Sequence, residues 1–210
     1  MSLRTLEEIK CPCGETFEAE IYQSVTIEDD PEVKDLILGG EFNMVQCPAC
    51  SEIIYAEHFV LYHDRDQELM AFVYPYSMQS EGEATRAEMT KTFVDLQEAL
   101  SKDEKLSYKP ILLFGMDQLC GLLTEDEEIS DEAEIVNHLC RSLGLKQRKI
   151  QRGLARERKI PSILPLENPQ NSHPRENLIQ GLQKILHAND RLVHYQKLLK
   201  LVKSDPAWKI

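Results

Sequence analysis

The chain has 210 residues, of which 42% are hydrophobic, which is enough for a packed core in one ordinary domain or two small ones. No apolar run approaches the ~20 residues that a membrane-spanning helix needs, and residues 1–10 lack the apolar stretch of a signal peptide. We therefore expect a protein of the cytoplasm that has no membrane partner.

The net charge of −12 is divided unevenly along the chain. Residues 1–135 carry 31 Asp and Glu against 9 Lys and Arg, a net charge of −22, whereas residues 136–210 carry 5 against 15, a net charge of +10. An acidic first part repels nucleic acid and anionic lipid, while a basic second part attracts either. The simpler interpretation is that surfaces of opposite charge attract each other within the fold or within a dimer.

Short strands and two cysteine pairs are predicted over residues 9–74. Residues 17–22 alternate apolar and polar side chains, which is typical of a half-buried strand. The other predicted strands lie around Val45 and over residues 53–60 and 69–74. Between the cysteine pairs, Asp30 as N-cap and Gly39 as the stop residue predict a short helix over about residues 31–38.

A polar connection in residues 75–105 leads into a predicted helix, whose single apolar stripe is made by Met89, Phe93, Leu96 and Leu100. Residues 111–114 are predicted to form a strand, and Asp117 is predicted to cap the helix that follows it. The acidic run 125–134 is expected to separate this helix from another around residues 135–143.

The last part of the chain begins with a basic segment, residues 146–159, which contains seven cationic residues and one Glu. We expect a surface helix that balances the acidic first part, and a recognition helix for nucleic acid is the alternative. Four prolines in the fourteen residues 161–174 predict a linker. Residues 175–203 have a helical pattern, either as one helix or as two with a break near Asn189.

Four of the six cysteines form two close pairs, Cys11 with Cys13 and Cys47 with Cys50. In a cytoplasmic chain this arrangement indicates metal or redox chemistry and not a disulfide framework. Gly14 supplies the positive φ that a tight metal-binding turn needs. Two such turns give four thiolates, which complete the tetrahedron of a structural Zn²⁺ and leave no open position for catalysis. Iron in the same thiolates and a redox dithiol are the alternatives.

No catalytic residues are predicted, because the sequence contains none of the common phosphate-loop, dinucleotide, nucleophile-elbow or zinc-protease motifs. His63 and Asp64 are adjacent in a predicted strand and point to opposite faces, so a capped strand end is favoured over a base and its orienting carboxylate. Cys120 and Cys140 lie on the apolar faces of predicted helices and are expected to pack as small hydrophobes.

Five separated motifs occur in a specific order: Cys11-Pro-Cys-Gly, Asp30-Pro-Glu-Val-Lys, Gly39-Gly-Glu-Phe, Cys47-Pro-Ala-Cys and Leu61-Tyr-His-Asp. Their order and spacing resemble the bacterial CpXC domain family, as does the strand, Phe-Gly turn and capped helix over residues 111–123. The resemblance covers residues 1–125 and implies a zinc-ribbon-like β module with an attached α part and no known activity. The sequence departs from the pattern at Ser51, where glycine commonly follows the second turn.

We therefore predict an α+β fold. A zinc-ribbon-like antiparallel β module with a short inserted helix occupies residues 1–125, and a largely α-helical region occupies residues 126–210. The expected function is that of a non-enzymatic zinc-binding protein that offers a platform to another protein. Nucleic-acid binding through residues 146–159 is the alternative, and a homo-oligomer is compatible with either.

Overall fold

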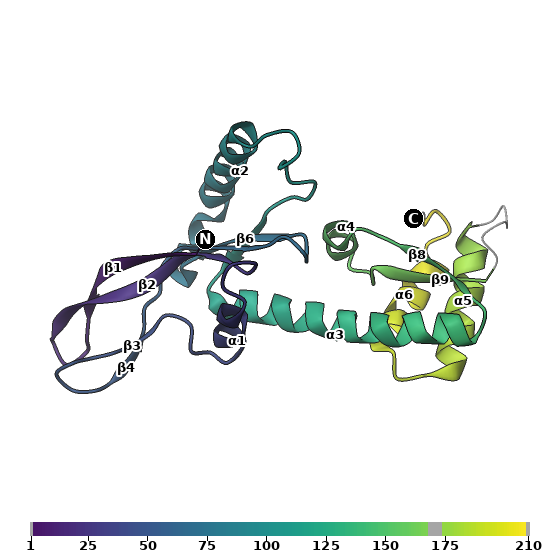
Figure 1. The fold of residues 1–210 in the computed structure, drawn as a ribbon, viewed down its shortest axis with the longest axis horizontal. Helices are drawn as coiled ribbons and strands as arrows, with labels where there is room; N and C mark the ends of the chain where they lie inside the picture. The colour runs from purple at the N-terminus through teal and green to yellow at the C-terminus, as the bar shows by residue number, and fades with distance from the viewer. Residues whose placement is uncertain (1, 168–173, 209–210) are drawn as a thin grey trace. The chain divides into compact units, whose positions relative to one another are not determined.

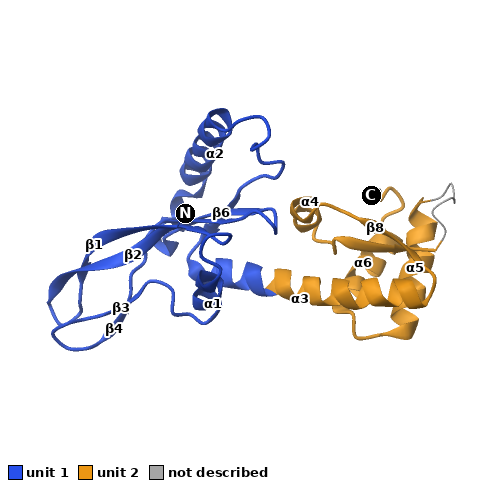
Figure 2. Ribbon diagram, viewed as in Figure 1, with its two compact units in different colours: residues 1–124 blue, residues 125–210 orange. Residues whose placement is uncertain are grey.

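In a computed structural model that describes residues 2–167 and 174–208, the chain divides into two compact units, residues 1–124 and 125–210 (Figure 2). The first unit contains a five-stranded sheet, a two-stranded sheet and helices, and the second is largely helical with a further two-stranded sheet. The predicted α+β fold class is confirmed.

The main sheet of the first unit has the strand order β1-β2-β5-β6-β7. Its strands β1, β2 and β6 are labelled in Figure 1. Its strands are β1 (Leu3–Lys10), β2 (Thr16–Thr26), β5 (Val60–Asp64), β6 (Leu69–Tyr74) and β7 (Ile111–Phe114). The expectation of an antiparallel module is wrong for two pairings, because β2 pairs with β5 and β6 pairs with β7 in parallel. Each parallel pair is joined by a long crossover that contains a helix, as parallel strands require.

The crossover from β2 to β5 contains helix α1 (Glu32–Leu38) and a hairpin of β3 (Met44–Gln46) and β4 (Ile53–Tyr55). The inner face of this hairpin packs on one face of the β1–β2 ribbon. The cluster has only three buried residues, Ile9, Ile21 and Ala56, and four partly buried ones, Phe17, Ala19, Val45 and Ile54. A core this small gives the hairpin little hydrophobic stabilisation of its own.

Strand β6 is buried along its whole length, so both faces of the sheet centre are covered. On one face, α1 and the first turns of α3 (Met116–Ser142) pack through residues such as Val33, Ile37 and Leu119. On the other face lies α2 (Gly82–Ala99), which follows a 3-10 helix, η1 (Tyr76–Glu81). The predicted apolar stripe of α2 packs there through Met89, Phe93 and Leu96.

Helix α3 runs without interruption from Met116 to Ser142, so the predicted break at the acidic run 125–134 is wrong. That run contains neither Gly nor Pro, and glutamate is a good helix former. Apolar residues at helical spacing, Ala133, Val136 and Cys140, also bury one side of the helix there. The acidic side chains are therefore borne on the helix and do not interrupt it.

The second unit adds β8 (Lys146–Lys149), α4 (Arg152–Glu157), β9 (Ile163–Leu166), α5 (Pro174–Ala188) and α6 (Val193–Ser204). The helix expected over 146–159 is wrong for residues 146–149, which form a strand after Gly144 turns the chain at φ +66°. The linker expected over 161–174 is wrong for residues 163–166, because β9 pairs with β8. Pro165 is tolerated there because both strands of a two-stranded sheet are edges. Residues 168–173 of that predicted linker lie outside the described residues.

The C-terminal helical segment is divided in two, which agrees with the alternative of a break near Asn189. Fully buried leucines of both helices, such as Leu178, Leu182 and Leu198, form the core of the second unit. None of the helices in the described residues is long and apolar enough to cross a membrane.

Candidate metal centre

The two cysteine pairs lie in the turns at the ends of the two ribbons that pack together in the first unit. Cys11 and Cys13 lie in the turn from β1 to β2, and Cys47 and Cys50 lie in the turn from β3 to β4. Their four Sγ atoms lie within 4.8 Å of one another. Within residues 2–167 and 174–208, no other three His, Cys, Asp or Glu side chains come this close.

The distances between the sulfurs suit a tetrahedral ion and not disulfides. The Sγ atoms are 3.5 Å apart for Cys11 and Cys50 and 3.8 Å apart for Cys13 and Cys47. Sulfurs bound at ~2.3 Å to one tetrahedral ion are separated by about 3.8 Å, whereas a disulfide brings them to about 2.05 Å. The four free thiols therefore form a donor set that fits a metal ion.

The two turns have the same hydrogen-bond pattern although the first is one residue shorter. In each, the residue after the second cysteine donates its N–H to the carbonyl of the first cysteine, from Gly14 to Cys11 and from Ser51 to Cys47, both at 2.9 Å. These two residues also have positive φ angles, +96° at Gly14 and +63° at Ser51. Ser51 thus occupies the strained position that glycine occupies in the first turn.

The thiols influence one another's protonation. The N–H of Cys13 acts to lower the pKa of the Cys11 thiol, but burial and the three other thiols outweigh it and raise that pKa to about 12. Burial acts to raise the pKa of the Cys47 thiol, but backbone N–H groups of its own turn and neighbouring thiols outweigh burial and lower it to about 7. A cation within the cluster would favour the deprotonated thiols, because it balances their negative charge.

The two cysteines of each turn differ in burial, and the order is the same in both turns. The first cysteine of each pair, Cys11 or Cys47, is buried, and the second, Cys13 or Cys50, is exposed. The cluster consequently lies at the surface of the first unit, with one buried and one exposed cysteine from each turn. An ion can reach it without the first unit opening.

Asn43 connects the two ribbons, and sequence reasoning did not identify it. Its side-chain Oδ1 accepts a hydrogen bond from the N–H of Tyr22 at 2.8 Å, and its Nδ2 donates one to the carbonyl of Tyr22 at 3.0 Å. Asn43 is buried and has a φ of +53°, a conformation that asparagine tolerates better than most residues. The only signal in the sequence is an asparagine between a Gly-Gly turn and a strand.

The other residues discussed from the sequence are not part of the four-cysteine cluster. His63 Nε2 lies 2.8 Å from the Tyr108 hydroxyl, and burial lowers the pKa of this imidazole. Asp64 accepts a hydrogen bond from the N–H of Gln67 at 2.9 Å, which caps the end of β5. Cys140 is buried, whereas Cys120 is only partly buried.

The basic segment does not form the recognition helix that was considered for it, because its only helix, α4, has six residues. Within the second unit, Arg156 of α4 pairs with Asp126 of α3 at 2.6 Å, so part of its charge is balanced internally. Nucleic-acid binding by residues 146–159 stays a prediction from the sequence.

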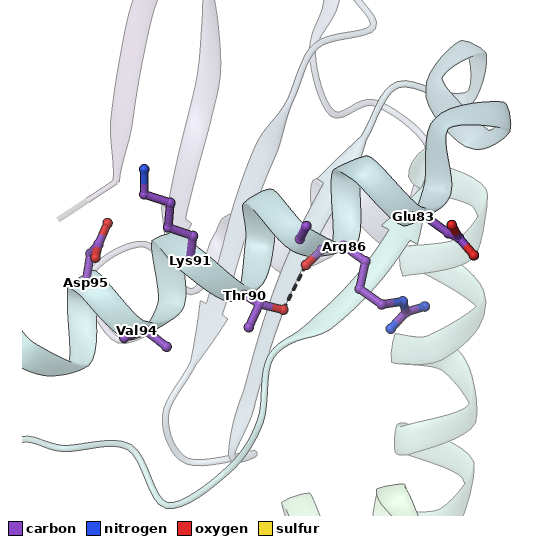
Figure 3. Close-up of a pocket in the computed structure, with 7 residues that line it drawn as sticks. Glu83, Arg86, Thr90, Lys91, Val94 and Asp95 are labelled. Atoms are coloured by element: carbon purple, nitrogen blue, oxygen red, sulfur yellow. Dashed lines mark hydrogen bonds between the residues drawn. The ribbon is translucent and has the colours of Figure 1, made fainter.

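The pocket in Figure 3 is an exposed face of α2 and not an enclosed site. All of its lining residues, from Glu83 to Asp95, come from this one helix. The Thr90 hydroxyl donates to the Arg86 carbonyl at 2.8 Å and is thereby used within the helix (Figure 3). We assign no ligand to this face.

A sequence model of the CpXC protein family matches residues 9–136, a range that includes both cysteine pairs and the main sheet from β2 to β7. No curated protein matches the chain, and no solved structure does. The family match covers more than half of the chain and contains all four clustered cysteines. This chain therefore belongs to the CpXC protein family.

Proposed function

We propose that this CpXC protein is a non-enzymatic cytoplasmic protein in which Cys11, Cys13, Cys47 and Cys50 bind one structural Zn²⁺. In this proposal the ion holds the β3–β4 hairpin against the β1–β2 ribbon, and the first unit presents a surface to another protein. The observation that carries the proposal is the cluster of four Sγ atoms within 4.8 Å, contributed by two turns.

The donor set supports a structural role for the ion. Four thiolates fill a tetrahedron, so no position is left for water or substrate. Tetrahedral sulfur sites hold zinc or iron. Zinc is proposed here because its filled d shell imposes no geometry of its own and suits two turns of unequal length.

The small size of the neighbouring core supports the same role. The hydrophobic cluster where the hairpin meets the ribbon has only three buried members, Ile9, Ile21 and Ala56. Structural zinc sites contribute ~10–16 kcal/mol of binding free energy to small modules, which exceeds what three buried side chains provide. The ion would therefore be the main link between the two ribbons.

The outer face of the hairpin supports the proposed protein partner. Met44 lies directly opposite Tyr55, and Ile53 is two residues along on the same face. These three side chains are 46%, 39% and 64% exposed. Neighbouring exposed apolar side chains are typical of protein interaction surfaces.

Elemental analysis of the full chain, purified without added metal, tests the zinc assignment. We expect one zinc per chain, lost in the variant with all four clustered cysteines replaced by serine and retained in the matched Cys120→Ser/Cys140→Ser variant. Metal-free wild type, or iron as the bound metal, would contradict the proposal. An Ile53→Glu variant that keeps its zinc should lose the proteins that copurify with wild type.

A further inference from the structure

Strand β1 has an open outer edge. It lies at the end of the main sheet, and no strand in residues 2–167 or 174–208 pairs with its outer side. Edges of this kind pair readily with another strand unless their side chains prevent it. The side chains and backbone groups along β1 therefore decide which strand it accepts.

The register with β2 shows which backbone groups are available on that edge. The N–H of Cys11 donates to the carbonyl of Glu15, and Ile9 lies opposite Phe17, so the odd-numbered residues of β1 direct their backbone groups toward β2. The even-numbered residues direct theirs outward. The same alternation explains why Tyr22, which lies opposite Arg4, has its backbone groups bonded to Asn43 on the side of β2 away from β1.

The side chains of these even-numbered residues form an unusual exposed row. Leu6 is 64% exposed, so a strand that covers this edge would remove its apolar surface from water. Glu8 lies directly opposite Glu18 of β2, and like charges in facing positions are unfavourable. Arg4 is already held on this face, with its guanidinium 4.2 Å from the centre of the Tyr22 ring.

We propose that β1 pairs with β1 of a second copy of this chain, antiparallel, about a two-fold axis at Leu6. In this register Leu6 lies opposite Leu6 of the second copy, and Arg4 lies opposite Glu8 of the second copy, twice by symmetry. The outward backbone groups of Arg4, Leu6 and Glu8 then exchange N–H···O=C bonds with the residues opposite them. The interface joins the two main sheets into one.

Charge complementarity selects this register and this partner. In this register the guanidinium of Arg4 lies near Glu8 and Glu18 of the second copy. Its positive charge offsets the repulsion between these two carboxylates. A shift by two residues in one direction places Arg4 opposite Lys10, and in the other direction it places Arg4 opposite Leu6, so the two ion pairs are lost. A two-fold contact of this kind is closed and produces a dimer and not a fibre.

The test is sedimentation of the full-length, metal-loaded chain over a concentration series, with far-UV circular dichroism and metal content as checks on folding. Wild type is expected to dimerise. Arg4→Glu and Glu8→Arg should each weaken the dimer by about tenfold or more, because two attractive pairs become repulsive. Glu15→Arg, a matched charge reversal in the β1–β2 turn beyond the paired residues, should leave the dimer unchanged.

Mixing the two single variants provides the decisive measurement. In a mixed dimer each Glu at position 4 faces an Arg at position 8, and the remaining Arg4 faces Glu8, so affinity should return to the wild-type level. Monomeric wild type at every concentration, or a dimer unaffected by both single variants, would overturn the proposal. A mixture that stays as weak as the single variants would also overturn it. None of these results depends on which metal the cysteines bind.

Discussion

The side-chain amide of Asn43 forms two hydrogen bonds with the backbone of Tyr22, at the place where a neighbouring strand would otherwise pair with β2. Asn43 precedes the hairpin that carries Cys47 and Cys50, and Tyr22 belongs to the strand that follows Cys11 and Cys13. This contact links the polypeptide of one cysteine turn to that of the other without the metal.

Replacing Asn43 with alanine should therefore destabilise the first unit by about 2–4 kcal/mol, because the N–H and carbonyl of Tyr22 lose their partners and alanine is strained at positive φ. Asn43→Gly keeps the backbone conformation and removes only the amide, so its loss should be smaller. Urea unfolding of both variants measures the two contributions. Equal stability of wild type and Asn43→Gly would show that the amide contributes nothing.

Ser51→Gly should stabilise the second cysteine turn by about 1 kcal/mol, because the residue has a φ of +63°, where a side chain is strained. Ser51→Ala keeps a Cβ and should show no such gain. The urea midpoint and the rate at which a chelator removes metal from the two variants make the comparison. A gain in the alanine variant equal to that of glycine would rule out relief of backbone strain.

Removal of the metal should loosen the β3–β4 hairpin and the adjoining end of the β1–β2 ribbon while the centre of the main sheet stays folded. The hairpin rests on a cluster of three buried residues, whereas β6 is buried along its whole length by separate cores on both faces. Hydrogen exchange should therefore accelerate in residues 44–55 and stay slow in residues 69–74. Loss of protection throughout the unit would show that the ion stabilises the whole sheet.

Acidification should destabilise the first unit through His63. Burial lowers the pKa of this imidazole in the folded state below its ordinary value of 6.5, so the unfolded state takes up a proton first as the pH falls. The stabilisation that depends on a neutral His63 is complete above about pH 6.5, and it is lost progressively as the pH falls below that value. Because all other groups are the same in both proteins, the difference in unfolding free energy between wild type and His63→Gln isolates the effect of His63. That difference should shrink as pH falls, and a constant difference would contradict the assignment.

Gly181→Ala should destabilise the second unit by about 2–3 kcal/mol, because an added Cβ would lie 2.7 Å from the carbonyl carbon of Pro165 and closer still to its oxygen. The backbone of β9 would have to move away from α5. Gly121→Ala is the matched control, since a Cβ there meets nothing within 4 Å and should add about 1 kcal/mol of helix stability. Thermal unfolding compares the two variants, and similar losses in both would refute the close approach.

The cysteine turns could be predicted because their signals are local. Proline within each pair, the glycine after the first pair and the spacing of the thiols are all properties of a few consecutive residues. The short helix α1 and the apolar stripe of α2 were predicted for the same reason. Each of these elements depends mainly on its own sequence.

The features that were missed depend on partners far away in the chain. The more buried side of β1 carries Thr5, Glu7 and Ile9, so the sequence lacks the alternation of apolar and polar residues that identifies a half-buried strand. β9 contains a proline and is a strand because β8 pairs with it. Asn43 acquires its role only from Tyr22, 21 residues earlier. No local pattern distinguishes these residues from ordinary loop positions.

The 34-residue separation between Cys13 and Cys47 also has a consequence during synthesis. A ribosome adds about 5–20 residues per second, so the first sulfur doublet is made roughly 2 to 7 s before the second. During that interval the nascent chain offers an ion two sulfurs and no more. The β1–β2 ribbon is therefore made before the two sulfurs that would complete its metal site.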